Sequence, residues 1–314
     1  MNRQTDGQMI RYARQLAAKH YGQEPVSIAP LGGGFYGRVF LAELDREPLK
    51  AVIKIYLFHG LNGREAEQLV ILGKYSAIKI PQIHFTHDAD NEIPVDALAM
   101  EYIDGINAGG LTDIPPSDRD RIADQIIDNL ISYHSVVHPE GFGEITGGPY
   151  EKDWRILYRG KACAIYHKAL DMQVRGKLSA AVCEAVKKAY DSFDLIFSEP
   201  VAAARLIHGD YNTWNILVNH GRTGCVAVID PFNCCWADSE LDLYQLSNAN
   251  GQYFGLLDKY RAKVPLSSNF EIKNSFYELF TEIMHYNDAG KDPAASNIPQ
   301  TARQLEIHMK NIGI

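Results

Sequence analysis

The strongest constraint on the fold of this chain is a pair of apolar segments between residues 206 and 230 that carry acidic and amide side chains. The first, LIHGDYNTWNILVN, places Asp210 and Asn215 five residues apart between two apolar runs. The second, AVIDP, ends an apolar run on Asp230. Short apolar runs bounded by turn residues are typical of buried strands. We therefore expect short buried strands around a loop, which would hold these polar side chains at the edge of a core.

The region before residue 103 predicts a small, strand-rich lobe. RVFLAEL and LKAVIKIYLF flank the turn-like DREP, a pattern that favours an antiparallel hairpin, and IPQIHFTHD and DALAMEYIDG indicate two more strands. In GREAEQLVILGKYS, Glu65, Leu69 and Leu72 recur on one helical face. An amphipathic helix is expected at the N-terminus. This lobe would comprise residues 1–102.

The region from residue 103 onward predicts a larger, mostly helical lobe. The segments 118–138 and 161–197, and NFEIKNSFYELFTEIMHYNDAG, show helical periodicity. A chain of 314 residues is long enough for two lobes. The predicted fold class is therefore α+β, with a β-rich lobe of residues 1–102 joined to a helical lobe of residues 103–314.

A glycine pattern in the first lobe suits a phosphate-binding flap. Gly32, Gly34 and Gly37 have G-x-G-x-x-G spacing, and a strand rather than a helix is expected after them. That order favours a kinase-type flap over nucleotide phosphates and argues against a dinucleotide-binding turn. Taken alone, the glycines fit an ordinary hairpin turn equally well.

A lysine in the hairpin is a candidate phosphate ligand. Lys54 lies in the apolar strand AVIKI, where an unpaired charge would be costly to bury. A lysine on the solvent face of the strand is the alternative, but the match to the V-A-I-K pattern of kinases favours function. Glu65 could orient Lys54, with Glu67 as the rival. We favour Glu65 because it shares the buried face with Leu69 and Leu72.

HGDYNTWN has the H-x-D-x-x-x-x-N spacing of a kinase catalytic loop. Asp210 would accept the proton of a substrate hydroxyl, or orient that hydroxyl. Asn215 and Asp230 would bind Mg²⁺, because amide and carboxylate oxygens suit this hard ion together with phosphate oxygens. A single Asp or Asn is more often a turn or cap residue. The glycine turn, Lys54, the HGDYNTWN loop and Asp230 follow one another in the order found in kinases. This order favours the functional interpretation, which is phosphoryl transfer.

These motifs resemble those of the aminoglycoside phosphotransferase and fructosamine kinase superfamily, small-molecule relatives of the protein kinases. IDP at 229–231 takes the place of the protein-kinase DFG, and EAEQLVIL resembles the family's helix. ADSELDLYQL matches the family's D-x-x-x-D-L element, in which Asp242 would brace the catalytic loop. The resemblance implies ATP bound between the lobes, its adenine against the connector that includes Glu101 and Ile103, and a small-molecule hydroxyl as acceptor.

Two segments lean toward the fructosamine-kinase branch. SYHSVVHPEGFGEITGG, followed by DW, is similar to its glycine–phenylalanine–glycine segment. FYELFTEIMHYNDAG is similar to its late H-x-N-x-x-G helix end, which implies that His285 and Asn287 lie near the substrate. Capping or packing is the alternative for both. Tyr211 and Asn212 replace the LW usual in that branch, and the spacing of PFNCCWADSE fits the aminoglycoside branch better, so ketoamines, aminoglycosides and related sugars stay open as acceptors.

Composition bounds the partners and the compartment. The net charge of −8, without a basic stripe, argues against nucleic acid and mildly favours an amine-bearing acceptor. The sequence shows no signal peptide and no apolar run long enough to span a membrane. The five cysteines are scattered without metal-binding spacing. We therefore expect a cytoplasmic protein.

Two alternatives to a small-molecule kinase are disfavoured by specific features. A protein kinase needs a long activation segment ending in A-P-E, and the chain leaves no room for one between Asp230 and Asp242. A catalytically inactive nucleotide-binding relative would usually have lost the lysine, the base or a metal ligand. This chain keeps all of these side chains, which are Lys54, Asp210, Asn215 and Asp230.

Overall fold

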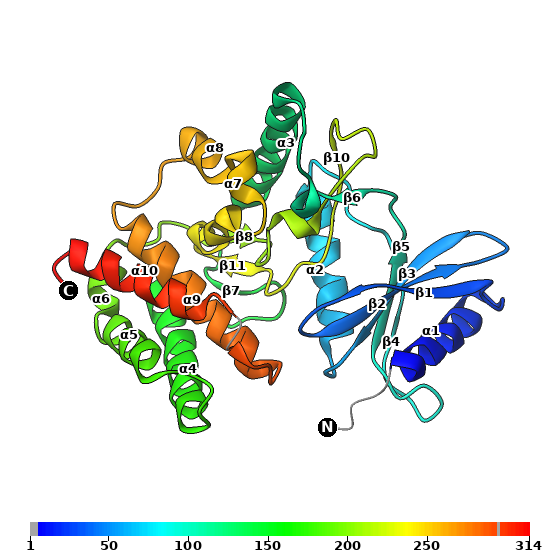
Figure 1. The fold of residues 1–314 in the computed structure, drawn as a ribbon, viewed down its shortest axis with the longest axis horizontal. Helices are drawn as coiled ribbons and strands as arrows, with labels where there is room; N and C mark the ends of the chain where they lie inside the picture. The colour runs from blue at the N-terminus through cyan, green and yellow to red at the C-terminus, as the bar shows by residue number, and fades with distance from the viewer. Residues whose placement is uncertain (1–5, 294–295) are drawn as a thin grey trace.

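The computed structural model describes residues 6–293 and 296–314, which form two lobes (Figure 1). The smaller lobe, drawn blue to cyan, contains a five-stranded sheet, and the larger lobe contains most of the helices. The α+β, two-lobed fold predicted from the sequence is confirmed. The division predicted at 102/103 falls between the end of β5 at Glu101 and the start of β6 at Ile106. Among the described residues, none of the helices is both long and apolar enough to cross a bilayer.

The sheet of the smaller lobe is antiparallel and has the strand order β1-β2-β3-β5-β4. The expected hairpin is β2 paired with β3, and Val39 lies opposite Lys54 in its register. The glycine turn joins β1 to β2, as a flap between two strands requires. The strands are β1 (Ser27–Gly33), β2 (Gly37–Glu43), β3 (Lys50–Tyr56), β4 (Ile83–His87) and β5 (Ala97–Glu101).

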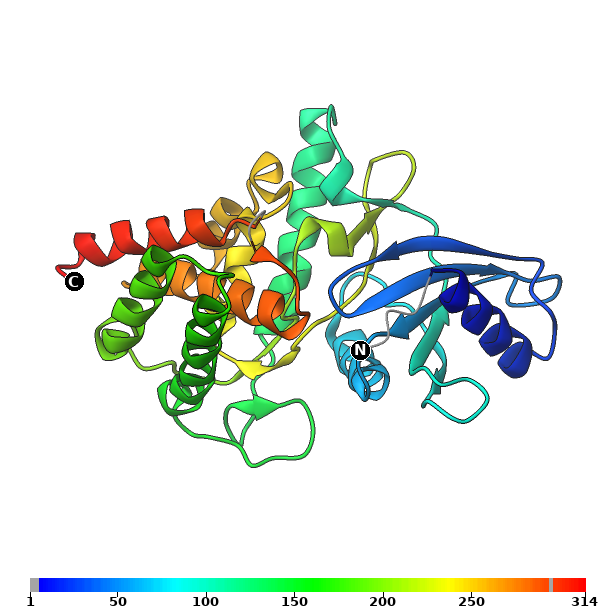
Figure 2. The ribbon, with the colours of Figure 1, turned by 60° about the horizontal axis from the view of Figure 1, so that its bottom comes forward.

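The two faces of this sheet pack against different helices. Ile53 and Ile55 on β3 share a buried apolar cluster with α1 (Asp6–Tyr21), which lies along the sheet in Figure 2. Successive side chains of a strand point to opposite faces. Lys54, between those isoleucines, therefore points to the other face, where α2 (Leu61–Tyr75) packs. The alternation in AVIKI thus places the lysine on the side of the cleft.

The larger lobe consists of helices around short strands. Its α-helices are α3 (Pro116–His134), α4 (Trp154–Val174), α5 (Ala180–Asp191), α6 (Phe193–Ile196), α7 (Gly251–Phe254), α8 (Leu256–Lys263), α9 (Phe270–Asp288) and α10 (Ile298–Asn311). Its 3₁₀ helices are η1 (Ala108–Gly110), η2 (Thr213–Asn215) and η3 (Ser239–Ser247). Two three-stranded sheets, β10-β9-β6 and β7-β11-β8, comprise β6 (Ile106–Asn107), β7 (Gly143–Glu144), β8 (Arg205–Ile207), β9 (Ile216–Val218), β10 (Cys225–Val228) and β11 (Cys235–Ala237).

The helical tract predicted for residues 161–197 is divided into α4, α5 and α6. The break has a local cause. Gly176 adopts φ 68° directly after α4, a left-handed conformation that commonly ends helices. Ser179 then caps α5, because its side chain accepts a hydrogen bond from the Val182 N–H.

The short buried strands expected around the HGDYNTWN loop are present. They are β8 before the loop, β9 after it and β10 before Asp230. The apolar side chains of these strands belong to the main core of the larger lobe, and Ile207, Ile216 and Val228 are fully buried. The loops that carry Asp210 and Asp230 therefore emerge from a rigid base.

Candidate functional site

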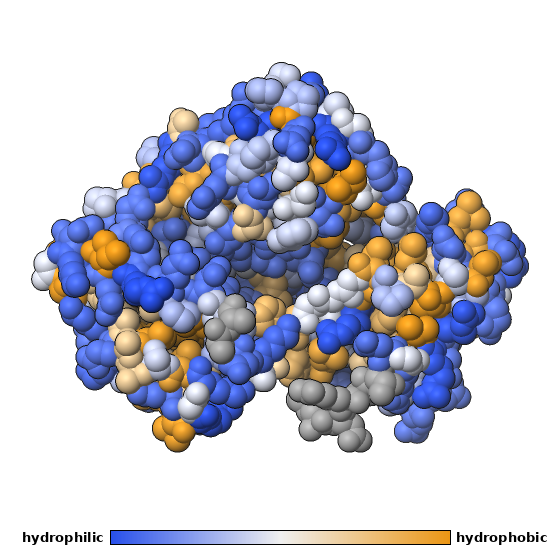
Figure 3. Space-filling model, in the orientation of Figure 1, coloured by the Kyte–Doolittle hydropathy of each residue, from blue (hydrophilic) through white to orange (hydrophobic). Residues whose placement is uncertain are grey.

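A cleft of about 540 Å³ lies between the lobes, where Figure 3 shows the surface hollowed. Its walls come from the glycine turn, β3, α2, the connector after β5, the loops after β8 and β10, and α9. The cleft brings together eleven of the twelve site residues proposed from the sequence. They are Gly32, Gly34, Gly37, Lys54, Glu65, Glu101, Ile103, Asp210, Asn215, Asp230 and His285.

Asn287, the twelfth residue, does not line the cleft. Its side-chain oxygen accepts a hydrogen bond from Arg175 Nη2 at 2.9 Å, and its nitrogen donates to Asp288, outside the cleft lining. Residues two apart on an α-helix are separated by about 200° around the axis. Because His285 faces the cleft from α9, Asn287 turns away from it.

The backbone of the HGD segment is fixed by Asp242. The carboxylate of Asp242 accepts hydrogen bonds from the backbone N–H groups of His208, at 2.8 Å, and Gly209, at 2.7 Å. Gly209 has φ 81°, and a Cβ there would lie 1.9 Å from the carbonyl oxygen of Phe232, so only glycine fits. His208 is fully buried, and burial lowers its pKa to about 4. Its Nδ1 accepts a hydrogen bond from the Asp210 N–H, which makes it a support of the loop.

The carboxylate of Asp210 is held by three side-chain amides. Its Oδ1 accepts from Asn212 Nδ2 and Gln245 Nε2, each at 2.8 Å, and its Oδ2 accepts from Asn215 Nδ2 at 2.9 Å. Burial and the nearby Asp230 carboxylate raise the pKa of Asp210 to about 7, while the amides of Asn215 and Asn212 oppose that rise. A partly buried carboxylate fixed in this way has the orientation that a catalytic base needs.

Gln245 and Asn212 were missed by sequence reasoning. Asn212 stands two residues after Asp210, a spacing at which a side-chain amide can reach back to its neighbour, so a local signal existed. Gln245 lies 35 residues from Asp210. Only the packing of η3 against the catalytic loop brings the two together.

Lys54 connects the two lobes through ion pairs. Its ammonium nitrogen lies 2.6 Å from Glu65 Oε2 and also pairs with Asp230. Burial alone would lower the pKa of Lys54, but the carboxylates of Asp230 and Glu65 raise it above its ordinary value. Tyr56 donates a hydrogen bond to the same oxygen of Glu65 at 2.8 Å. Lys54 is therefore a fixed positive charge in the cleft, and Glu65 rather than Glu67 is its partner on α2.

The side chains of Asn215 and Asp230 suit a magnesium ion that is also bound by phosphate. The side-chain nitrogen of Asn215 is directed at Asp210. The side-chain oxygen of Asn215 is therefore left to bind a metal ion. Asp230 is about half exposed and adopts φ 56°, a strained backbone conformation of the kind found at functional sites. Within residues 6–293 and 296–314, no group of three or more His, Cys, Asp and Glu side chains is placed to hold a metal alone. The donor set therefore fits Mg²⁺, which usually combines one or two protein ligands with phosphate oxygens.

The end of the cleft next to the connector is apolar. The carboxylate of Glu101 is engaged by Lys79 and by the Gln82 N–H. The apolar surface beside it suits contact with an aromatic base. Its apolar walls are Val39, Val52, Met100, Ile103, Leu217 and Ile229.

The tip of the glycine turn reaches across to the larger lobe. The Tyr36 ring stacks on Phe232, with centroids 4.4 Å apart. The Tyr36 hydroxyl lies 3.0 Å from His285 Nδ1. Burial lowers the pKa of His285 to about 4, so this imidazole is neutral at physiological pH and can accept the hydrogen bond. The glycine turn is therefore attached to the larger lobe at Phe232 and His285.

Comparison with known proteins gives a family match over most of the chain. Residues 27–260 match the sequence profile of the phosphotransferase enzyme family, APH. YcbJ of Escherichia coli K12, an uncharacterised protein, is 19% identical over 258 residues, which span 80% of this chain and 83% of YcbJ.

Solved structures of small-molecule kinases share the fold. A candidate fructosamine-3-kinase from Thermobifida fusca is 22% identical with a TM-score of 0.66, over 94% of this chain and 98% of that one. A thermostable mutant of aminoglycoside phosphotransferase APH(4)-Ia, in complex with AMP-PNP and hygromycin B, is 14% identical with a TM-score of 0.68, over 96% and 98%. At these identities the likeness establishes the kinase-like fold.

Proposed function

The chain belongs to the phosphotransferase enzyme family, and from this we propose that it transfers the γ-phosphoryl group of ATP, with Mg²⁺, to a hydroxyl group of a small molecule. A fold does not by itself assign an activity. The observation that carries the proposal is the convergence of Lys54, Asp210, Asn215 and Asp230 in one cleft.

Each side chain has a separate task in this reaction. Asp210 accepts the proton of the acceptor hydroxyl as that oxygen bonds to the γ-phosphorus, and the bond to the bridging oxygen breaks to release ADP. Lys54 binds phosphate oxygens and is oriented by Glu65. Asn215 and Asp230 would hold the metal. When bound, Mg²⁺ neutralises charge on the phosphates.

The segment after Asp230 supports a small acceptor. Between Asp230 and η3 the chain forms only a short loop and β11, which pairs with β8 and β7. A long activation segment that could bind a protein substrate has no place there.

Charge beside the cleft favours an amine on the acceptor. Glu278, Glu282 and His285 recur at helical spacing on one face of α9, and His285 lines the cleft. Burial and the charge of Glu282 raise the pKa of Glu278 to about 7. An ammonium group nearby would stabilise the charged forms of both carboxylates. Amine-bearing sugars, such as ketoamines and aminoglycosides, have this chemistry.

The test is a coupled ADP-release assay with Mg²⁺ and ATP against ketoamines, amino sugars, aminoglycosides and plain sugars. We expect turnover with an amine-bearing class, and Asp210→Asn should reduce it by about 10²- to 10⁴-fold while nucleotide binding is retained. ATP binding is checked separately by thermal shift. Turnover that survives in Asp210→Asn would remove Asp210 from the mechanism, and no binding of nucleotide would overturn the proposal.

A further inference from the structure

One of the three tryptophans is exposed in the cleft, next to the proposed metal ligand. Trp154 and Trp236 are 1% and 5% exposed, whereas Trp214 is 53% exposed and lines the cleft. Trp214 directly precedes Asn215 in η2. A large aromatic ring left open to solvent at a ligand cleft forgoes burial that the core could have provided, so its position calls for an explanation.

The backbone of Trp214 is held from both sides. Its N–H donates to Asn212 Oδ1 at 2.9 Å, and its carbonyl oxygen accepts a hydrogen bond from the side-chain nitrogen of Asn107. Asn212 also binds the Asp210 carboxylate. The backbone that carries the indole is therefore fixed relative to the proposed catalytic base.

One side of the indole rests directly on the backbone of η1. A Cβ built on Gly109 would lie 2.6, 2.9 and 3.0 Å from three atoms of the ring, Cδ2, Cε2 and Cε3. Similar distances to several ring atoms mean that Gly109 approaches the face of the indole and not its edge. The neighbouring Gly110 is less close, because its Cβ would lie 3.7 Å from the nearest ring atom. The indole can lie flat against η1 only because residue 109 is glycine.

We propose that Trp214 is a stacking platform for a sugar ring of the bound ligands. This inference rests on the proposed function. Trp214 lines the same cleft as the connector residues Ile103 and Gly105, where an adenine would sit, and Asp210 and Asn215, where phosphoryl transfer would occur. In that arrangement the ribose of the nucleotide or a sugar acceptor would come next to the indole. Aromatic faces favour the C–H faces of sugars, and an indole that is already fixed loses little entropy on binding.

The platform is tested by tryptophan fluorescence, because the other two tryptophans are buried. Mg²⁺ with AMP-PNP, Mg²⁺ with tripolyphosphate and a panel of amino sugars are titrated into the full chain. A ribose contact predicts an emission change with AMP-PNP and none with tripolyphosphate. A contact with the acceptor predicts a further change when an amino sugar joins AMP-PNP. Either result supports the proposal, and Trp214→Ala should abolish the response and weaken that ligand by about tenfold, with Trp214→Phe closer to wild type.

A pair of glycine variants tests the platform without removing the ring. Gly109→Ala would displace the indole, so it should reproduce the loss of affinity seen in Trp214→Ala. Gly110→Ala is the matched control, since its Cβ makes only ordinary contact, and should behave as wild type. If ligands bind by thermal shift but neither the emission nor the affinities of Trp214→Ala and Gly109→Ala change, Trp214 is not a platform and the proposed function stands. If AMP-PNP does not bind at all, both proposals fall.

Discussion

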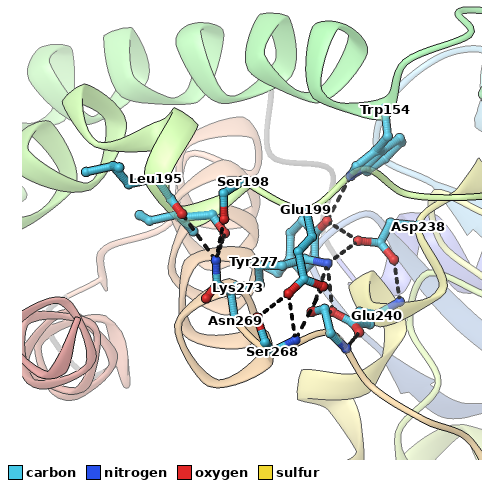
Figure 4. Close-up of polar contacts among 12 residues, drawn as sticks. Trp154, Leu195, Ser198, Glu199, Asp238, Glu240, Ser268, Asn269, Lys273 and Tyr277 are labelled. Atoms are coloured by element: carbon cyan, nitrogen blue, oxygen red, sulfur yellow. Dashed lines mark hydrogen bonds and ion pairs between the residues drawn. The ribbon is translucent and has the colours of Figure 1, made fainter.

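Two lysines that are largely withdrawn from solvent each pair with two carboxylates, but in different surroundings. Lys54 pairs with Glu65 and Asp230 in the cleft. Lys273, on α9, pairs with Asp238 Oδ2 at 2.8 Å and Glu240 Oε2 at 2.7 Å in the interior of the larger lobe (Figure 4). Burial disfavours the charge on both lysines, and in both cases the carboxylates raise the pKa above its ordinary value.

The two clusters differ in how completely they are shielded from solvent. We call the Lys273 cluster closed and the Lys54 cluster open. In the Lys273 cluster every member is nearly buried, and the remaining oxygens have protein donors. Tyr277 donates to Asp238, and the Ser267 hydroxyl and N–H donate to Glu240. In the Lys54 cluster, Asp230 is 48% exposed and comes from the opposite lobe. A buried lysine with two acids is therefore not in itself a sign of function; an open carboxylate in a cleft is the distinguishing feature.

The closed cluster still supports the site from behind. The Asp238 side chain caps η3 by accepting the Glu240 N–H at 3.1 Å. The same helix carries Asp242, which holds the HGDYNTWN loop, and Gln245, which holds Asp210. Lys273 thus fixes the element behind the proposed base without contacting the cleft.

The largest expected effect is loss of stability when the closed cluster loses its cation. Lys273→Met leaves Asp238 and Glu240 buried without their positive charge, which should cost about 3–5 kcal/mol of unfolding free energy. The measurement is denaturant unfolding, and turnover of the folded fraction should fall far less than in Lys54→Met. Lys187→Met is the control, because Lys187 forms an exposed pair with Asp191 and should matter far less. A loss as small as that of Lys187→Met would refute the distinction.

Lys54→Met should reduce activity strongly and stability less. Removing a fixed cation from the proposed phosphate site should lower kcat/KM for ATP by about 10²- to 10³-fold. The unfolding free energy should fall less than in Lys273→Met, because Asp230 is half exposed and can be hydrated. Steady-state kinetics and denaturant unfolding on the same preparations decide this. Comparable stability losses for the two lysines would mean that the Lys54 pair is as structural as the Lys273 pair.

The contrast also shows what the sequence could reveal. Lys54 was identified because AVIKI is a local pattern on one strand, and strand alternation predicts its direction. Lys273 gave a weaker signal: it precedes Phe276, Tyr277 and Phe280 at helical spacing, on a face that the structure buries.

Some contacts between distant segments were beyond the reach of sequence reasoning. The acids that meet Lys273 stand more than 30 positions upstream, and Gln245 meets Asp210 only through folding. The site was predictable where a motif is contiguous, as in HGDYNTWN. The resemblance carried no information on how α9 is rotated, so it could not tell that His285 lines the cleft and Asn287 does not.

A smaller effect is expected for Glu278, which is partly buried and lies about two turns before His285 on α9. Burial and Glu282 raise its pKa from 4.5 to about 7, so the folded state holds its proton more tightly than the unfolded state. Stability should therefore fall as the pH rises from about 4.5 to 7. Glu278→Gln removes this loss and should be more stable than wild type by about 1–3 kcal/mol at pH 8, with little difference at pH 4.5.

Unfolding of both proteins at the two pH values measures the Glu278 effect. A gain of equal size at both would exclude electrostatics as its cause. The same variant should bind amine-bearing acceptors more weakly while neutral sugars are unaffected, because only an ammonium interacts with the lost charge. Stability and acceptor binding would then change in opposite directions, as expected for a carboxylate kept for function.

The smallest expected effect concerns the contact that closes the flap over the open cluster. Tyr36→Phe removes the hydroxyl that bonds His285 but keeps the ring stacked on Phe232. A single neutral hydrogen bond contributes about 0.5–1.5 kcal/mol, so KM for ATP should rise by no more than about tenfold with kcat nearly unchanged. Tyr36→Leu also loses the stack and should raise KM further. If Tyr36→Phe instead lowers kcat as strongly as Lys54→Met, the hydroxyl acts in the reaction itself, and the cleft would contain a second functional group that the paired lysine and acids do not explain.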